Sequence, residues 1–236
     1  MIKIGSLTLG GTPRVALSVK DRVPPSILRK AKQLGVDLVE CRIDQYASFE
    51  AKYVVNEVKK IKGLPKIATI RLRREGGKWS LAETARLNLF KAVMPCVDAV
   101  DIELSAKEIL PDLIREARRR KKIVIVSCHN FKKTPADAKL RQVLQQGKKL
   151  GAGIVKIATL VHRRKDLQRL ASFTIAHAGK NLICIGMGAQ GTSTRLLFPG
   201  VGSLITYTHM GQPTAPGQID CKTTLEFLKK MYPKES

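Results

Sequence analysis

Short runs of apolar, often β-branched residues alternate along this chain with longer segments whose apolar positions recur at a helical period. A run that is apolar at successive positions is typical of a strand buried on both faces, as in a parallel sheet. The pattern predicts eight such strands, over residues 14–19, 36–42, 66–71, 99–103, 123–128, 153–157, 182–185 and 202–206.

Helical signals lie between several of these strands. Residues 24–35 carry proline near the first turn and stop at glycine, which is the usual asymmetry of helix ends. Ser80 and Glu83 have the spacing of a capping box and predict a helix that starts there. Pro135 is predicted at the first position of another helix, and residues 225–231 predict the last one.

The order of these elements predicts the fold. Each strand is followed by a helix or by a segment compatible with one, and repeated strand–helix units favour a parallel sheet. Eight units fit an α/β fold, the closed (β/α)8 TIM barrel. Residues 2–11 predict a β-hairpin, turning at Gly10-Gly11, that closes the bottom of the barrel. No linker or low-complexity tract divides the chain, so one catalytic domain over residues 1–236 is expected.

A doubly wound sheet that binds a dinucleotide is the competing architecture. The segment from Gly186 to Gly191 follows a predicted strand and matches the spacing G-x-G-x-x-G. Twenty residues further on the chain has Gly211, not the acidic residue that would bind a ribose hydroxyl. The motif therefore gives dinucleotide binding little support.

Composition narrows the class of protein. The chain is 44% hydrophobic, enough for a sizeable core, yet it has no uninterrupted apolar run of the ~18–20 residues that a membrane helix needs. Its first residues lack the basic-then-apolar layout of a signal peptide, so a cytoplasmic protein without membrane contact is expected. The five cysteines are scattered without a C-x-x-C pair or a nearby histidine and carboxylate cluster, so no metal site is expected.

The charge is strongly positive, with 43 Lys and Arg against 19 Asp and Glu and a formal net charge of +24. Such an excess favours anionic partners, either nucleic acid or small acids. The chain is poor in aromatic residues and has no zinc-finger or RNP-type motif. The charge alone therefore does not indicate nucleic-acid binding, and no nucleic-acid partner is expected.

Polar residues recur at the carboxyl ends of the predicted strands, where barrel enzymes carry their catalytic groups. Lys156 is the most informative, because lysine is rarely buried and this one lies within an apolar run. Burial and nearby arginines would leave some neutral amine, which can attack a carbonyl and form an imine. The residue could equally extend to the barrel mouth or pair with Asp101 or Glu103.

The other strand ends offer acid–base and anion-binding groups. His129 could act as a general base or could bind a loop carbonyl. Arg42, Arg71 and Arg195 should meet at one mouth, where arginine binds carboxylates through two hydrogen bonds, although they could also be surface cations. Glu75 could orient a histidine ring or cap a turn.

In combination these segments resemble type I 3-dehydroquinate dehydratase over essentially the whole chain. The matching segments are Glu40-Cys-Arg42-Ile-Asp44, Thr69 to Gly77, Asp101-Ile-Glu103-Leu104, Val124 to Phe131, Gly153 to Ala158, Met187 with Gly191 and Arg195, and Thr214-Ala-Pro-Gly-Gln218. Seven matches in order, at compatible spacing, make the signal specific. The chain departs from the family pattern at Ile185, where a methionine is common, at Tyr207, usually phenylalanine, and at Thr214, usually serine.

The resemblance implies a lyase of the shikimate pathway, in aromatic amino acid biosynthesis, which converts 3-dehydroquinate to 3-dehydroshikimate. Lys156 would form a Schiff base with the ketone, His129 would move the protons, and Glu75 would orient His129. The substrate-binding set would be Glu40, Arg42, Arg71, Met187, Arg195, Tyr207, Thr214 and Gln218, with Arg195 on the carboxylate. The residues from Thr214 to Gln218 would close over the substrate. The family implies a homodimer without metal or cofactor. The alternative enzyme is another imine-forming barrel, such as an aldolase.

Overall fold

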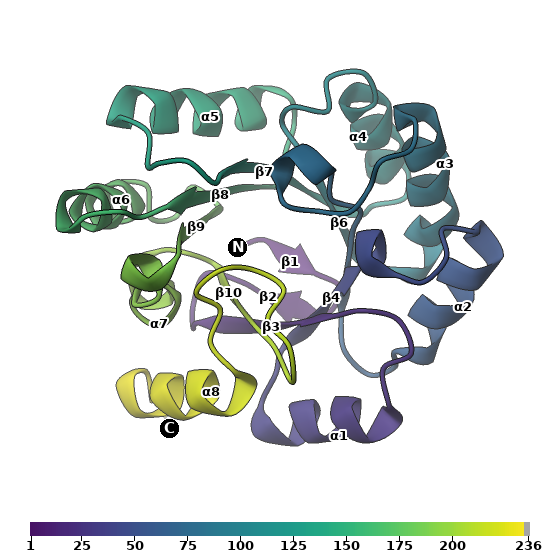
Figure 1. Cartoon of the computed structure of the whole chain (residues 1–236), viewed down its shortest axis with the longest axis horizontal. Helices are drawn as coiled ribbons and strands as arrows, with labels where there is room; N and C mark the ends of the chain where they lie inside the picture. The colour runs from purple at the N-terminus through teal and green to yellow at the C-terminus, as the bar shows by residue number, and fades with distance from the viewer. Residues whose placement is uncertain (234–236) are drawn as a thin grey trace.

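A computed structural model describes residues 1–233 as an eight-stranded parallel barrel surrounded by helices (Figure 1). The barrel strands are β3 (Arg14–Val19), β4 (Leu38–Arg42), β5 (Lys66–Thr69), β6 (Ala99–Glu103), β7 (Ile123–Asn130), β8 (Ile154–Leu160), β9 (Leu182–Met187) and β10 (Ile205–Thr208). The helices are α1 (Pro25–Leu34), α2 (Ala51–Lys60), α3 (Glu83–Val93), α4 (Leu110–Arg119), α5 (Asp137–Lys149), α6 (Arg164–Ala176), α7 (Thr194–Leu197) and α8 (Cys221–Met231). The (β/α)8 architecture expected from the sequence is confirmed.

The sheet closes into a barrel between its first and last strands. Neighbouring strands pair in the order β10-β3-β4-β5-β6-β7-β8-β9, all in parallel. At the seam the backbone N–H of Leu204 donates to the carbonyl of Leu182 at 2.9 Å, and Leu182 forms a parallel bridge with Ser203. The parallel arrangement brings all carboxyl ends to one mouth.

The side chains that point into the barrel change character along each strand. The first inward position is apolar on every strand, and these residues form one buried cluster at the bottom: Ala16, Leu38, Ile67, Ala99, Ile125, Ile154, Ile183 and Ile205. Because side chains alternate between the faces of a strand, the next inward residue comes two positions later. On six of the strands that residue is polar and buried, as at Glu40, Asp101 and Lys156. The polar groups thus lie directly above the apolar cluster at the bottom of the barrel.

A two-stranded hairpin closes the barrel at the end opposite the mouth, as expected. It consists of β1 (Lys3–Ile4) and β2 (Leu7–Thr8), which are antiparallel. Ile4 and Leu9 are 0% and 1% exposed and belong to the cluster at the bottom of the barrel. The turn falls at Gly5-Ser6, not at Gly10-Gly11, because Gly5 adopts a positive φ of 56° and begins the turn.

Two predicted helix starts are wrong. The helix expected at Ser80 begins at Glu83, after Ala82, and no side chain caps it. Pro135 precedes its helix, which begins at Asp137. In both segments the chain stays extended for two or three residues while it leaves the mouth. No helix among residues 1–233 combines the length and apolar character required to cross a bilayer.

Candidate active site

Lys156 is a buried lysine inside the barrel mouth, only 5% exposed. Its Nζ donates to Oδ2 of Asp101 at 3.0 Å and lies 3.6 Å from Oε1 of Glu40. The same nitrogen lies 3.9 Å from the centroid of the Tyr207 ring. The sequence left open whether nearby arginines or a pair with Asp101 or Glu103 would surround this lysine; the structure shows the pair with Asp101, which lies between Lys156 and Arg71 and contacts both. The structure thus combines burial in the pocket with ion pairing.

The two carboxylates beside Lys156 are held in the charged form. Burial opposes the ionisation of Asp101, but Arg71 and Lys156 outweigh it and hold the pKa of that carboxyl well below its usual value. Burial likewise opposes ionisation of Glu40, while Lys156 and Arg42 lower its pKa. An amine or iminium at Lys156 therefore always faces negative charge.

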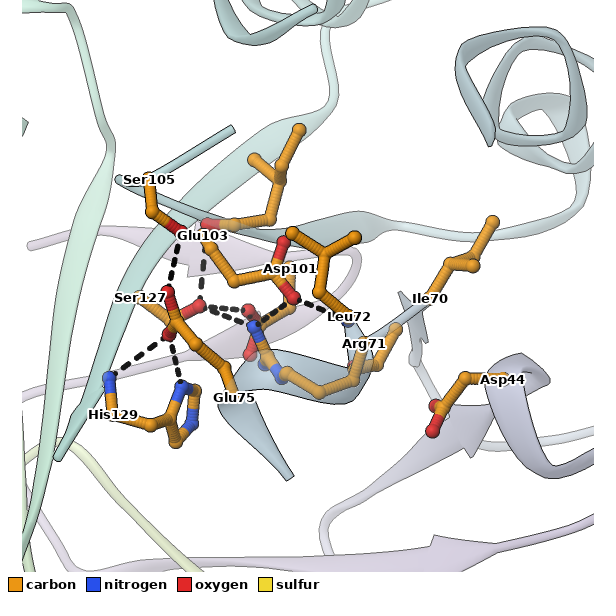
Figure 2. A network of polar contacts seen from close by, with 12 residues as sticks. Asp44, Ile70, Arg71, Leu72, Glu75, Asp101, Glu103, Ser105, Ser127 and His129 are labelled. Atoms are coloured by element: carbon orange, nitrogen blue, oxygen red, sulfur yellow. Dashed lines mark hydrogen bonds and ion pairs between the residues drawn. The ribbon is translucent and has the colours of Figure 1, made fainter. Parts of the chain in front are cut away.

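His129 lies on β7 and is oriented by Glu75. Oε2 of Glu75 is 3.0 Å from both the backbone nitrogen and Nδ1 of His129, and its other oxygen accepts from the hydroxyl of Ser105. Figure 2 shows the Glu75 carboxylate between these two residues. A carboxylate at Nδ1 places the ring proton there and leaves the Nε2 lone pair free to take a proton.

The charge states of this pair follow from its surroundings. Burial lowers the pKa of His129 below its usual value, and the positive charge of Arg71 acts in the same direction, while the hydrogen bond that His129 donates to Glu75 opposes this shift. Burial opposes ionisation of Glu75, but the hydrogen bond with His129, the hydrogen bond from Ser105 and the nearby positive charge of Arg71 together hold the pKa of Glu75 below its usual value. At neutral pH the pair is thus a neutral imidazole held by a carboxylate.

A tight turn brings Glu75 to His129. The turn of 3-10 helix Arg73–Glu75 ends at Gly76, whose φ is +79°. A Cβ at Gly76 would lie 2.3 Å from the ring of Phe131, so both the backbone conformation and the space require glycine. Any larger residue here would displace the turn that carries Glu75.

Arg42 and Arg71 line the pocket, but protein carboxylates already occupy their guanidinium groups. Arg42 donates from Nε and Nη2 to the two oxygens of Asp44 at 3.0 and 2.9 Å. Arg71 donates to Asp101 at 2.7 Å and pairs with Glu103 at 3.1 Å. The residues alone led us to group these two arginines with Arg195, whereas the family resemblance assigned the substrate carboxylate to Arg195; the structure shows Arg42 and Arg71 paired with protein carboxylates.

Arg195, at the start of α7, is the arginine that remains available. It is 3% exposed, and among the described residues no carboxylate lies within ion-pairing distance of it. Its Nη2 donates to the carbonyl of Pro216 at 3.0 Å, and its Nε has no partner in residues 1–233. Burial lowers the pKa of Arg195 to about 10, and Glu40 opposes that shift, so the guanidinium stays charged at neutral pH. A buried cation without a carboxylate partner in residues 1–233 indicates a site for an anion.

The segment between β10 and α8 covers the pocket, and Figure 1 shows it crossing the barrel opening. Oε1 of Gln218 accepts from the backbone nitrogen and hydroxyl of Thr214 at 2.7 and 3.1 Å. Nη1 of Arg42 donates to the carbonyl of Thr214 at 3.2 Å, and Arg195 holds Pro216. Two site arginines therefore hold this loop over the cavity.

All eleven site residues expected from the sequence line one cavity. They are Glu40, Arg42, Arg71, Glu75, His129, Lys156, Met187, Arg195, Tyr207, Thr214 and Gln218. The arrangement supplies an amine, a base on a carboxylate, and an unpaired cation, which together suit covalent chemistry on a small anionic ketone. Within residues 1–233 no three His, Cys, Asp or Glu side chains are grouped to hold a metal ion.

The sequence analysis missed several lining residues, among them Ser18. Its hydroxyl donates to Oε2 of Glu40 at 2.7 Å and accepts from Gln218 at 3.4 Å. Ser18 is the polar residue near the end of the apolar run 14–19, so the signal that identified the other strand ends was present there too. Gly76, Phe131, Ala158, Ile185 and Ala215 also line the cavity.

Comparison with known proteins matches this chain to 3-dehydroquinate dehydratases. The model of a family described as type I 3-dehydroquinase matches residues 22–235. A 3-dehydroquinate dehydratase of Thermodesulfovibrio yellowstonii is 36% identical over 227 residues, which cover 95% of this chain and 98% of that protein.

Solved structures agree with the sequence matches. The crystal structure of the 3-dehydroquinate dehydratase from Aquifex aeolicus is 35% identical, with a TM-score of 0.83 over 93% of this chain and 99% of that one. The type I 3-dehydroquinate dehydratase from Clostridium difficile, solved with covalently modified comenic acid, is 27% identical, with a TM-score of 0.86 over 98% and 96% of the two chains.

Proposed function

The chain belongs to the type I 3-dehydroquinase family, and on this premise we propose that it dehydrates 3-dehydroquinate to 3-dehydroshikimate through an imine on Lys156. One observation carries the proposal: a buried amine, a neutral histidine on a carboxylate and an unpaired buried arginine share one cavity. Dehydroquinate offers a ketone, an acidic C–H next to it, a leaving hydroxyl and a carboxylate. Each of these has a matching protein group.

The reaction proceeds in four balanced steps. The neutral amine of Lys156 adds to the ketone, and the carbonyl oxygen leaves as water with one proton from the nitrogen and one from solvent, which gives an iminium; hydrolysis later returns the solvent proton. Nε2 of His129 takes a proton from the adjacent carbon and forms an enamine, because the iminium makes that proton acidic. The imidazolium then protonates the hydroxyl on the next carbon, which leaves as water. Hydrolysis of the conjugated iminium releases the product and restores the amine, so that one water is lost overall.

The charges of the pocket suit this covalent cycle. The iminium is positively charged, so Asp101, whose carboxylate lies 3.0 Å from Nζ, pairs with it in the intermediate. Arg195 binds the substrate carboxylate, and Glu40, Ser18 and Gln218 provide hydrogen bonds for hydroxyl groups. The loop from Thr214 to Gln218 excludes water while the imine exists.

Purified protein tests the proposal directly. Incubation with 3-dehydroquinate should produce the ultraviolet absorbance of the conjugated product. Borohydride added during turnover should reduce the imine and add one ligand mass at Lys156, located by peptide mass spectrometry. Carbon–carbon cleavage without dehydration would instead indicate an aldolase, and neither reaction would reject the proposal.

The pH dependence tests the His129–Glu75 pair. Because the base must be neutral and burial lowers the pKa of His129, kcat/KM should stay constant at neutral pH and fall about tenfold per unit only below ~6.5. Glu75→Gln removes a group that raises this pKa, so the acid limb should move to lower pH while the maximal rate drops. Glu108→Gln, at an exposed carboxylate nearby, is the control. An acid limb that moves to higher pH would contradict the pairing.

Arg195→Gln tests the anion site. Losing a charged hydrogen-bond donor should weaken substrate binding by roughly 10- to 150-fold. Since the variant also removes an unpaired buried cation, its melting temperature should be equal to or above that of the native protein. Titration calorimetry and thermal denaturation measure both effects, with the exposed Arg141→Gln on α5 as control. Unchanged affinity would show that the carboxylate binds elsewhere.

The family resemblance carries further expectations that stay predictions. They are a single catalytic domain over residues 1–236, a homodimer, a cytoplasmic location, a place in the shikimate pathway, and the absence of cofactor, metal and nucleic acid. Size-exclusion chromatography with light scattering measures the oligomeric state. Activity after dialysis against a chelator tests the metal.

A further inference from the structure

Tyr207, on β10, carries a buried hydroxyl that the proposed chemistry does not use. The residue is 4% exposed and lines the cavity, and its hydroxyl has no hydrogen-bond partner within residues 1–233. Buried polar groups are nearly always paired, and an unpaired one costs free energy in the folded state. Because this residue lines a ligand cavity, a bound ligand is the partner that the described residues leave open to its hydroxyl.

The position of the ring determines what the hydroxyl can reach. Nζ of Lys156 lies 3.9 Å from the ring centroid, so the carbon that joins Nζ in the imine is held beside the same ring. The phenolic oxygen lies on the edge of that ring. Groups attached one carbon away from the imine carbon therefore also lie close to this ring.

The phenol acts as a donor. Burial raises the pKa of Tyr207 well above its usual value, and the negative charges of Glu40 and Asp101 act in the same direction. The hydroxyl therefore stays protonated at any pH at which the enzyme works. A sugar-like hydroxyl on the substrate is a suitable neutral acceptor.

We propose that the Tyr207 hydroxyl donates a hydrogen bond to the substrate hydroxyl on the carbon next to the ketone, on the side away from the departing water. Tyr207 thereby becomes a specificity-determining residue of this chain, at a position where the family pattern has phenylalanine. The inference rests on the proposed function, since it takes dehydroquinate as the ligand.

Other unpaired groups in the described part of the chain do not suggest the same role. Thr206 Oγ1 and His209 Nδ1 are also buried without a partner, but neither residue lines the cavity. Tyr46 resembles Tyr207 closely, because it is 6% exposed and its hydroxyl is unpaired, yet it lies in the core outside the barrel. Tyr46 is therefore a matched control.

The test compares Tyr207→Phe with Tyr46→Phe, two variants that each lose one buried hydroxyl. Tyr207→Phe should lower kcat/KM for dehydroquinate roughly 3- to 15-fold, mainly through a higher KM, with an unchanged or higher melting temperature. Tyr46→Phe should leave kcat/KM unchanged. The substrate analogue that lacks the hydroxyl next to the ketone should be used equally well by native protein and Tyr207→Phe.

The outcomes separate this inference from the proposed function. Native protein that turns over dehydroquinate, together with a Tyr207→Phe variant of equal kcat/KM, would overturn the inference alone. An equal loss on dehydroquinate and on the deoxy analogue would also overturn it, because the ring would then act through packing. Native protein that forms no borohydride adduct at Lys156 would overturn the proposed function, and this inference with it.

Discussion

Lys156→Ala is expected to lower the turnover of 3-dehydroquinate by at least roughly 10⁵-fold, which amounts to loss of activity. Without the amine no iminium can form, and the proton next to the ketone stays too weakly acidic for an imidazole to remove. The measurement is product absorbance at saturating substrate, together with borohydride trapping, which should give no adduct.

A second variant at this position separates imine formation from charge. Lys156→Arg keeps a cation beside Asp101, whose oxygen lies 3.0 Å from Nζ, but a guanidinium does not form this imine. It should be as inactive as the alanine variant and yet fold normally. Lys165→Ala, at an exposed lysine at the start of α6, should behave like the native protein. Substantial activity in Lys156→Arg would rule out the covalent route.

His129→Ala is expected to lower kcat by roughly 10²- to 10⁴-fold while it still permits the imine to be trapped. The base acts after the imine has formed, so its loss should allow the covalent intermediate to accumulate. Mass spectrometry after borohydride treatment should find a larger adduct fraction than in the native protein.

His162→Ala is the matched control for this variant. His162 is exposed, and its Nε2 contacts the carbonyl of Lys132 at 2.7 Å, outside the cavity. Its turnover should equal that of the native protein. Near-native turnover in His129→Ala, or an absence of adduct there, would contradict the assigned role of His129.

Much of the fold follows from the sequence because a barrel strand is apolar on both faces. That pattern located all eight strands and their order, with ends displaced by up to three residues, as at β10, which begins at Ile205. The helix starts were less predictable. Ser80 is a residue type that commonly caps helices. The residue before it, Trp79, however forms backbone hydrogen bonds with Arg71 and Arg73, which hold this segment outside the helix. Such long-range contacts override a local capping preference.

The membership of the site was predictable for a simple geometric reason. Inward residues on a strand recur every second position, so a polar residue two places after an apolar inward one must lie in the barrel. Ile154 followed by Lys156, and Ile125 followed by Ser127 and His129, are examples. Ser18, two places after Ala16, obeys the same spacing and was overlooked.

The residues by themselves did not distinguish the three arginines, and only the family resemblance assigned the substrate carboxylate to Arg195. Whether Arg71 is free depends on Asp101, thirty residues further along the chain, which β5 and β6 bring opposite Thr69 in the ladder. Arg71 lies in a basic segment with Arg73 and Arg74, whereas Arg195 is the only charged residue from Gly186 to Gly202, and neither context shows whether its guanidinium is paired. Only the strand register shows that one guanidinium is neutralised and the other is not.

The hairpin of β1 and β2 closes one end of the barrel and leaves the mouth as its opening. Ile4 and Leu9 fill its base, so neither ligand nor solvent can pass through. Substrate must enter past the loop of Thr214, and product must leave by the same route. A second substrate can therefore bind only after the product has been released. The rate at which the Thr214 loop opens therefore sets an upper limit on the turnover rate, however fast the chemical steps are.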